Sequence, residues 1–299
     1  MPRFGQVVTA MVTPFHKDGS LNLDGAKRLA RWLQDNGNDG LVIAGTTGEA
    51  PVLTDDERLS LFKAVVEAVT IPVIAGTGTN DTAHSIHLTK EATKLGVAGI
   101  LAVTPYYNRP SQAGIDGHMR AVCGSTNLPV VIYDIPVRTG RKINTTTLAK
   151  LANEVKNVAG VKDAAGNPAE SARLMTMVPK SFELISGDDG LTLPLMAVGC
   201  TAVIGVATHW SGVDHQEMFK KWDAGDTAGA RAVNARLVES FAFETGDDNP
   251  NPIPSKVMMS HLGFDVGECR PPMGPPPAGL AERAAQVHAN LEKARAALR

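Results

Sequence analysis

The feature that most constrains the fold is a regular alternation of short apolar segments with longer amphipathic ones. The short segments are rich in Val and Ile and are bounded by Gly, Pro, Asp or Asn, as is typical of buried parallel strands. They span residues 7–11, 41–44, 73–76, 99–103, 130–134, 158–162, 183–186 and 202–206. Helix-like stretches lie between them, among others at 24–36, 55–69, 82–95 and 145–154.

Eight strand–helix units in about 225 residues predict an α/β fold of the (β/α)8 or TIM barrel type. A doubly wound open sheet is the alternative, but it usually has fewer strands and a glycine-rich phosphate loop after the first one. Thr13-Pro14-Phe15 does not provide such a loop. Beyond about Trp222 only helices are predicted, at 226–243, 254–262 and 280–297. We therefore expect a barrel domain over 1–225 and a small C-terminal α-helical domain over 226–299.

Composition and charge exclude several classes of function. The formal net charge is −2, so the chain lacks the basic excess that favours nucleic acid or an acidic membrane surface. No apolar run approaches the roughly 20 residues needed to cross a bilayer, and the N-terminus does not resemble a signal peptide. The three cysteines show no CxxC spacing, so neither a disulfide framework nor a zinc site is expected. A cytoplasmic enzyme is the expectation.

Polar side chains collect where predicted strands end. The second strand is followed by Gly45-Thr46-Thr47-Gly48-Glu49, the fourth by Thr104-Pro105-Tyr106-Tyr107-Asn108, the fifth ends in Tyr133-Asp134 and the sixth in Lys162-Asp163. All three tyrosines of the chain fall at these ends. Because the carboxyl ends of barrel strands form the active-site face, these groups should meet there. They include no cluster of His, Cys or carboxylates that would suggest a metal.

Lys162 and Tyr133 point to amine chemistry. Burial at a strand end disfavours the ammonium form of Lys162, which makes a neutral, nucleophilic amine available near neutral pH. On the neighbouring strand, the phenol of Tyr133 can carry protons to and from an adduct on that amine. A lone lysine at a strand end more often extends to solvent, and a tyrosine there often only caps the core. The two together favour the catalytic interpretation.

Two further segments can bind carboxylates. Thr46 and Thr47 offer hydroxyl and backbone N–H groups, and Gly45 and Gly48 allow close approach, although such a sequence can also be a plain tight turn. Arg138, in the loop after the fifth strand, can hold a second carboxylate through its planar guanidinium. A surface arginine is the equally weighted alternative.

Taken together, these segments resemble the dihydrodipicolinate synthase family, within the pyruvate-dependent class I aldolases. The resemblance runs from about residue 5 to 272 and rests on motifs in the expected order. They are Gly45-Thr-Thr-Gly-Glu49, Val103-Thr-Pro-Tyr-Tyr-Asn-Arg-Pro110, Tyr133-Asp-Ile-Pro-Val-Arg-Thr-Gly140, Gly160-Val-Lys-Asp163, Ser186-Gly-Asp-Asp189 and Asn249-Pro-Asn-Pro-Ile-Pro254. Asp134 and Asp163 stand where the family frequently has Asn and Glu, which leaves the catalytic assignment intact.

The resemblance implies a lyase that condenses pyruvate with L-aspartate 4-semialdehyde to 4-hydroxy-tetrahydrodipicolinate, the entry step of the diaminopimelate and lysine pathway. It implies a Schiff base on Lys162 and no metal or organic cofactor. It also implies a homotetramer built of two tight dimers. The remaining roles it implies are a proton relay of Thr46, Tyr133 and Tyr107, with Tyr107 from a neighbouring subunit, Thr47 and Arg138 as carboxylate binders, and Gly187 and Ile204 as pocket-lining residues.

Other functions stay open from the sequence. N-acetylneuraminate lyase and 2-keto-3-deoxygluconate aldolase share the lysine and tyrosine, but a sugar acceptor would favour a smaller or neutral group than Arg138. The tandem Tyr106-Tyr107 is a second discriminating feature. A non-catalytic barrel that senses a keto acid would keep the carboxylate site and lose Lys162 or Tyr133.

The resemblance also bears on regulation by free lysine, which inhibits many relatives at a pocket beside Tyr106. The matching positions here are Ala50, Pro51, Asp55, Arg58, Asn80, His84 and Tyr106. His84 stands where an inhibited relative has a carboxylate, and Arg58 adds a like charge toward an ammonium ligand. Asp55 could partly compensate. We therefore expect weak or no inhibition by lysine.

Overall fold

The eight predicted strands form a closed barrel in the computed structural model, which describes residues 2–297. Each strand pairs in parallel with its sequence neighbours, and β8 closes on β1. The (β/α)8 prediction is confirmed, with every strand end within two residues of expectation. The strands are β1 Val7–Ala10, β2 Gly40–Ile43, β3 Val73–Gly76, β4 Gly99–Val103, β5 Val130–Asp134, β6 Val158–Asp163, β7 Glu183–Ser186 and β8 Cys200–Gly205.

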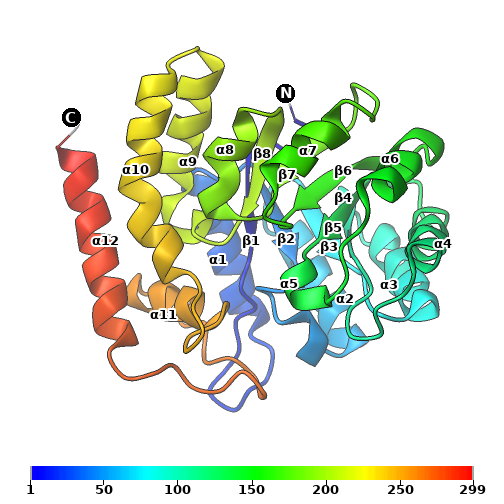
Figure 1. Ribbon diagram of the computed structural model, residues 1–299. Coiled ribbons are helices and arrows are strands. Elements are labelled where there is room, and N and C mark those ends of the chain that lie inside the picture. The colour runs from blue at the N-terminus through cyan, green and yellow to red at the C-terminus, as the bar shows by residue number, and fades with distance from the viewer. Residues whose placement is uncertain (1, 298–299) are drawn as a thin grey trace.

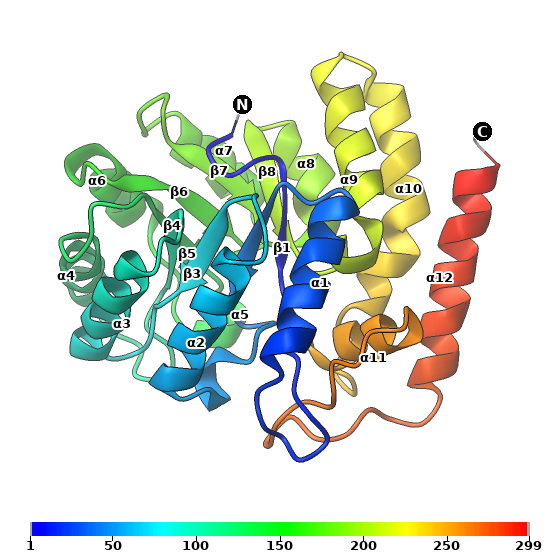
Figure 2. The same ribbon diagram turned by 180° about the vertical axis from the view of Figure 1, so that it is seen from behind.

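Helices surround the barrel, as Figures 1 and 2 show. The predicted helices are confirmed within three residues at each end. In chain order the helices are α1 Leu23–Asp35, η1 Ala50–Val52, α2 Asp55–Val66, α3 Thr82–Lys94, α4 Gln112–Cys123, α5 Pro136–Thr139, α6 Thr145–Glu154, α7 Pro168–Met175, η2 Asp189–Leu191, α8 Thr192–Met196, α9 Thr208–Asp223, α10 Thr227–Phe243, α11 Ile253–His261 and α12 Leu280–Ala296.

Alternation along each strand divides the core into two layers. Val131, Tyr133 and Ile204 belong to the cluster inside the barrel, whereas Ile132 and Val161 pack in the larger cluster between barrel and helices. Successive side chains of a strand point to opposite faces. Because Val161 faces the helices, the next residue along β6 must point into the barrel.

The C-terminal helices pack on one side of the barrel. Helices α10 and α12 lie outside α9, and α11 lies near the carboxyl ends of the strands (Figures 1 and 2). A third apolar cluster joins Val7 and Val203 of the barrel to Leu237, Met258 and Val287. The expected boundary at 225/226 falls in the turn between α9 and α10, and the division into two domains stays a prediction.

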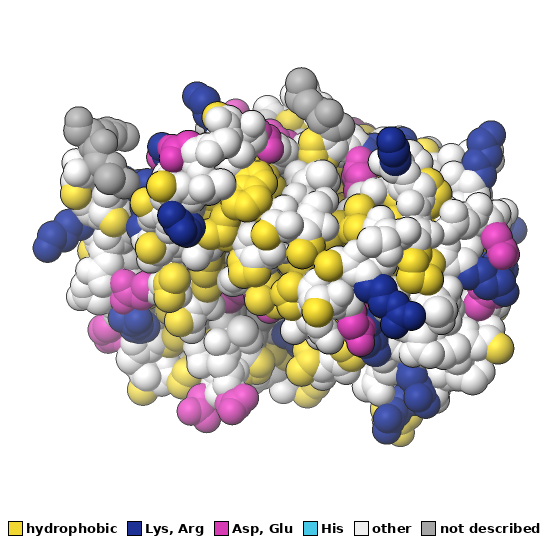
Figure 3. Space-filling view, turned by 45° about the horizontal axis from the view of Figure 1, so that its top comes forward, with side chains coloured by type: hydrophobic (Ala, Val, Ile, Leu, Met, Phe, Trp, Pro, Cys, Tyr) yellow, Lys and Arg dark blue, Asp and Glu magenta, His cyan; other side chains and the backbone are white. Residues whose placement is uncertain are grey.

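The surface agrees with the small net charge. On the face shown in Figure 3, which lies largely away from the carboxyl ends of the strands, basic and acidic side chains are interspersed around an apolar central area. Among residues 2–297, no helix is both long and apolar enough to span a membrane.

Candidate active site

Lys162 and Tyr133 lie side by side at the carboxyl ends of β6 and β5. The strands pair in a register that sets Tyr133 opposite Lys162, and the Lys162 Nζ lies 4.2 Å from the centroid of the Tyr133 ring. Lys162 is only 4% exposed. Burial and, to a smaller extent, the nearby Arg138 charge lower the pKa of Lys162 to about 8, against the opposing charges of Asp189 and Glu244. A substantial share of this amine is therefore neutral near physiological pH.

The space around Lys162 depends on Gly187 and Ile204. A Cβ atom at Gly187 would lie 2.9 Å from Lys162 Cγ and 3.1 Å from Lys162 Cε, too close for any side chain. Ile204 is buried in the same interior cluster as Tyr133. Both predicted pocket-lining residues therefore lie in the barrel end that holds the amine, and Gly187 has a physical requirement for glycine.

The phenol of Tyr133 is kept in its protonated form. Burial raises the pKa of Tyr133 to about 12, although Arg138 and a hydrogen bond with Thr46 lower it in part. A protonated phenol that contacts Thr46 on one side and Lys162 on the other can donate a proton and take it back. The structure thus brings together three of the predicted site residues.

The turn after β2 is held from several directions. Its Gly48 carbonyl accepts a hydrogen bond from Thr13 Oγ1 at 2.6 Å, and the Glu49 N–H donates to the Thr46 carbonyl at 3.0 Å. Thr47 is buried, and its Oγ1 accepts from Asn251 Nδ2 at 2.9 Å. The two threonines are therefore fixed in a rigid turn at the edge of the site.

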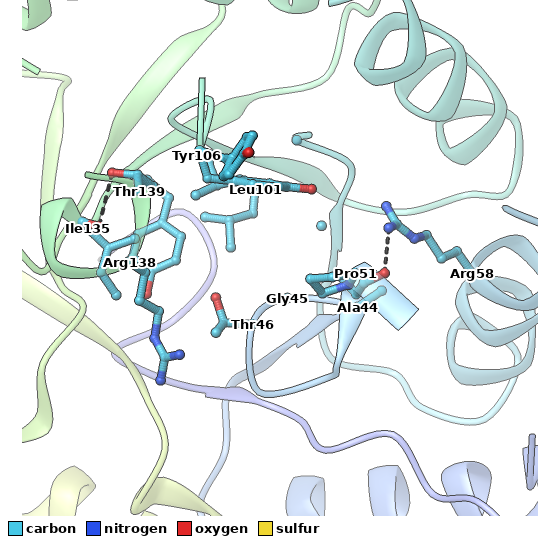
Figure 4. Close-up of a pocket in the computed structure, with 16 residues that line it drawn as sticks. Ala44, Gly45, Thr46, Pro51, Arg58, Leu101, Tyr106, Ile135, Arg138 and Thr139 are labelled. Carbon is cyan, nitrogen blue, oxygen red and sulfur yellow. Dashed lines mark hydrogen bonds between the residues drawn. The ribbon is translucent and has the colours of Figure 1, made fainter. Parts of the chain in front are cut away.

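A pocket of about 320 Å³ lies next to this turn and to Tyr133. Thr46, Tyr107, Tyr133 and Arg138 line it, and Figure 4 shows the Thr46 and Arg138 side chains on one side and Tyr106 on another. The predicted residues outside its lining are Lys162, Thr47, Gly187 and Ile204. Lys162 contacts the ring of Tyr133, which does line the pocket, so one side chain separates the amine from the pocket.

The rim of the pocket is formed by exposed groups. Tyr107 is 90% exposed and has a left-handed backbone conformation with φ of 72°. Arg138 lies in α5 and donates one long hydrogen bond, Nη2 to the Asn251 carbonyl at 3.4 Å. Both side chains are free to adjust to what enters the pocket.

The other part of this pocket contains the positions expected to matter for free lysine. Ala50, Pro51, Arg58 and Tyr106 line it. Arg58 is buried, and one of its nitrogens bonds to the Ala50 carbonyl (Figure 4). The other three positions, Asp55, Asn80 and His84, lie outside its lining, and two of them are paired with each other. The Asp55 carboxylate already pairs with His84 Nε2, at 2.8 Å and 3.0 Å.

Two acidic residues that the sequence reasoning gave no role lie behind the amine. Asp189 and Glu244 are buried and accept hydrogen bonds from the Val206 and Ala207 N–H groups at 2.7 Å and 3.0 Å. Burial raises the pKa of Glu244 well above its ordinary value, and the neighbouring Asp189 raises it further. Burial also acts on Asp189, but its contact with His215 Nε2 at 3.4 Å and the hydrogen bond from the Val206 N–H hold its pKa low. Asp189 therefore carries the negative charge of the pair.

Asp134 and Asp163, which stand where the family frequently has Asn and Glu, face away from the barrel interior. Asp134 accepts from the Ile143 N–H at 3.2 Å, and Asp163 accepts from Ser171 Oγ at 2.6 Å. Burial raises the pKa of Asp134 to about 6. These carboxylates hold the loops after β5 and β6.

Asn251 is a second omission of the sequence reasoning. Its amide binds Thr47 and its carbonyl accepts from Arg138, so one residue links both predicted carboxylate binders. Asn251 lies in the motif of residues 249–254 that resembles the family, but its partners are remote in sequence. Among the described residues, no group of three or more His, Cys, Asp or Glu side chains is arranged to hold a metal ion.

Comparison with known proteins matches the chain to one family over almost its whole length. The profile of the dihydrodipicolinate synthetase family matches residues 3–294. The chain is 48% identical over 275 residues to a 4-hydroxy-tetrahydrodipicolinate synthase of Moorella thermoacetica, covering 91% of this chain and 92% of the relative. It is 45% identical over 292 residues to the synthase of Desulforamulus reducens, covering 96% and 97% of the two chains.

A solved structure gives the same result. The dihydrodipicolinate synthase of Cyanidioschyzon merolae, solved with lysine bound, is 38% identical to this chain and superposes with a TM-score of 0.94. The match covers 98% of this chain and 99% of that one. From the shared fold, the matched length and these identities, the chain belongs to the dihydrodipicolinate synthase family.

Proposed function

We propose that this protein condenses pyruvate with L-aspartate 4-semialdehyde to give 4-hydroxy-tetrahydrodipicolinate and water. The observation that carries the proposal is the buried amine of Lys162 against Tyr133, below a turn suited to a carboxylate. Full-length membership of the synthase family supports the same reaction. A cytoplasmic location, expected from the sequence, stays a prediction.

The first half of the reaction activates pyruvate. Neutral Lys162 Nζ attacks the ketone carbon while Thr46 and Thr47 hold the carboxylate. The carbinolamine then loses water, with Tyr133 donating the proton that the departing hydroxyl needs. The resulting iminium withdraws electrons from the adjacent methyl group, which loses a proton to the Tyr133 oxygen left deprotonated by that step and becomes an enamine. The buried Asp189 charge lies near the iminium and stabilises it.

The second half forms the carbon–carbon bond. The enamine carbon attacks the aldehyde carbon of the semialdehyde, whose carboxylate Arg138 binds, and the new alkoxide takes a proton from the Tyr133–Thr46 relay. The amino group of the bound semialdehyde then attacks the iminium carbon. This step closes the ring and releases Lys162, so the only water lost is the one expelled when the Schiff base formed.

Reductive trapping tests the proposal. Borohydride added with pyruvate should reduce the iminium and leave a stable adduct on Lys162, which peptide mass analysis locates. Activity should fall in proportion to the adduct. An adduct on another lysine, or none, would contradict the mechanism.

We further propose that the active form is a homotetramer of two tight dimers in which Tyr107 completes a neighbouring site. Tyr107 and Val137 at the rim are 90% and 86% exposed, unusual values for apolar and aromatic side chains. Sedimentation of the active enzyme should show an oligomer. A fully active monomer would remove the role of Tyr107 across an interface.

A further inference from the structure

The residue that ends the carboxylate-binding turn has an uncommon backbone conformation. Glu49 has φ of 56°, the left-handed region that glycine adopts readily and other residues rarely do. Such a conformation persists only where the surrounding contacts hold it. Glu49 is buried at 3% exposure, so its contacts come from the protein itself.

The first of these contacts is a buried lysine from the C-terminal part of the chain. Lys256, in α11, is 3% exposed, and its Nζ forms an ion pair with Glu49 Oε1 at 2.7 Å. The same ammonium donates to the Glu268 carbonyl at 2.9 Å and lies 4.2 Å from the centroid of the Phe15 ring. The ammonium group of Lys256 is therefore held on several sides.

The second contact comes from the segment that follows α11. The Arg270 N–H donates to Glu49 Oε2 at 2.8 Å, so both carboxylate oxygens of Glu49 are engaged. The Arg270 guanidinium also lies 4.2 Å from the Phe15 ring centroid and binds Glu57 and the Gly19 carbonyl. In Figures 1 and 2 this C-terminal segment runs close to the loop after β1.

We propose that the Glu49–Lys256 ion pair is a positioning device, by which the C-terminal segment sets the orientation of Thr46 and Thr47 toward the carboxylate of pyruvate. The proposal rests on the function proposed above. Glu49 is bonded through its N–H to the Thr46 carbonyl, so a change of its backbone conformation moves the turn. Stability alone does not account for the pair, because buried ion pairs are often no more stabilising than apolar residues of the same size.

The test compares two buried ion pairs. Lys256→Met removes the cation beside the turn, and Arg236→Met removes one that pairs with buried Asp214 at 2.7 Å in the layer of α9, α10 and α12. Both variants should lower the melting temperature. Only Lys256→Met should raise the pyruvate concentration that gives half-maximal borohydride trapping, by about tenfold or more, because small misplacements of binding groups are costly. Its KM for pyruvate should rise more than its KM for the semialdehyde.

Glu49→Gln provides a second variant of nearly unchanged size in case Lys256→Met does not fold, and it should show the same selective rise for pyruvate. Half-saturation for pyruvate within about twofold of the wild type in a folded Lys256→Met or Glu49→Gln protein would overturn the inference. An equal rise in Arg236→Met would overturn it too, because the effect would then be general. Failure of the wild type itself to be trapped at Lys162 would instead contradict the proposed function.

Discussion

The floor and the rim of the pocket are built in opposite ways. At the floor, Lys162 and Tyr133 are buried, in register on paired strands, and have pKa values shifted by their surroundings. At the rim, Tyr107 and Val137 are almost fully exposed, and Arg138 has a single long hydrogen bond. The floor is complete within one chain. We expect the rim to acquire its geometry from substrate or from another subunit, so the two regions should respond differently to substitution.

The largest effect is expected at the floor. Lys162→Met removes the nucleophile and should lower kcat by at least about 10³-fold, since a thioether cannot form the iminium. The measurement is the steady-state rate at saturating substrates, with circular dichroism to show that the barrel is intact. Activity within tenfold of the wild type would show that the floor does not carry the chemistry.

A smaller and more selective effect is expected at the rim. Arg138→Ala should raise KM for aspartate semialdehyde by roughly 30- to 150-fold, the effect of losing a charged contact of about 2–3 kcal/mol. KM for pyruvate should change far less, because the proposed binding site of its carboxylate is the turn after β2. If both KM values rose together, Arg138 would contribute to the binding of pyruvate as well as of the semialdehyde.

The pH dependence sharpens the comparison further. Lys162 attacks only when neutral, and its pKa is about 8, so kcat/KM for pyruvate should rise with pH and level off above about 8. The Asp189 charge raises this pKa, so Asp189→Asn should move the midpoint to lower pH by roughly one unit. Asp163→Asn is the matched control, because this carboxylate follows Lys162 in sequence but bonds Ser171 outside the barrel. Equal shifts in both variants would contradict the assignment of Asp189.

The smallest effect is expected from free lysine. Asp55, a carboxylate that could meet its ammonium group, is already paired with His84, and Arg58 is a buried cation in the same pocket. Millimolar lysine should therefore leave the rate at saturating pyruvate almost unchanged. Half-maximal inhibition below 1 mM (roughly −4.1 kcal/mol of binding) would show that the Asp55–His84 pair opens for the ligand.

Local patterns were enough to predict the barrel and the direction of Lys162, because strand alternation is a property of adjacent residues. Remote contacts were not predictable in this way. Asn251 meets Thr47 across 204 residues, and Arg270 meets Glu49 across 221. Nothing near Asn251 or Lys256 in the sequence indicates these partners. The pairing of Asp55 with His84 was not predictable either, because it joins two successive helices, α2 and α3.

The Glu49–Lys256 pair has a consequence for how the enzyme is made. When a ribosome has synthesised the whole barrel, Lys256 and Arg270 are still missing, and the turn with Thr46 and Thr47 lacks the groups that hold it. Contacts this distant in sequence form late, after the entropy of closing a long loop has been overcome. Given the proposed positioning role, we expect a nascent chain to complete its strands before it can bind substrate well, and a premature stop codon before position 256 to leave a barrel with an unsupported active site.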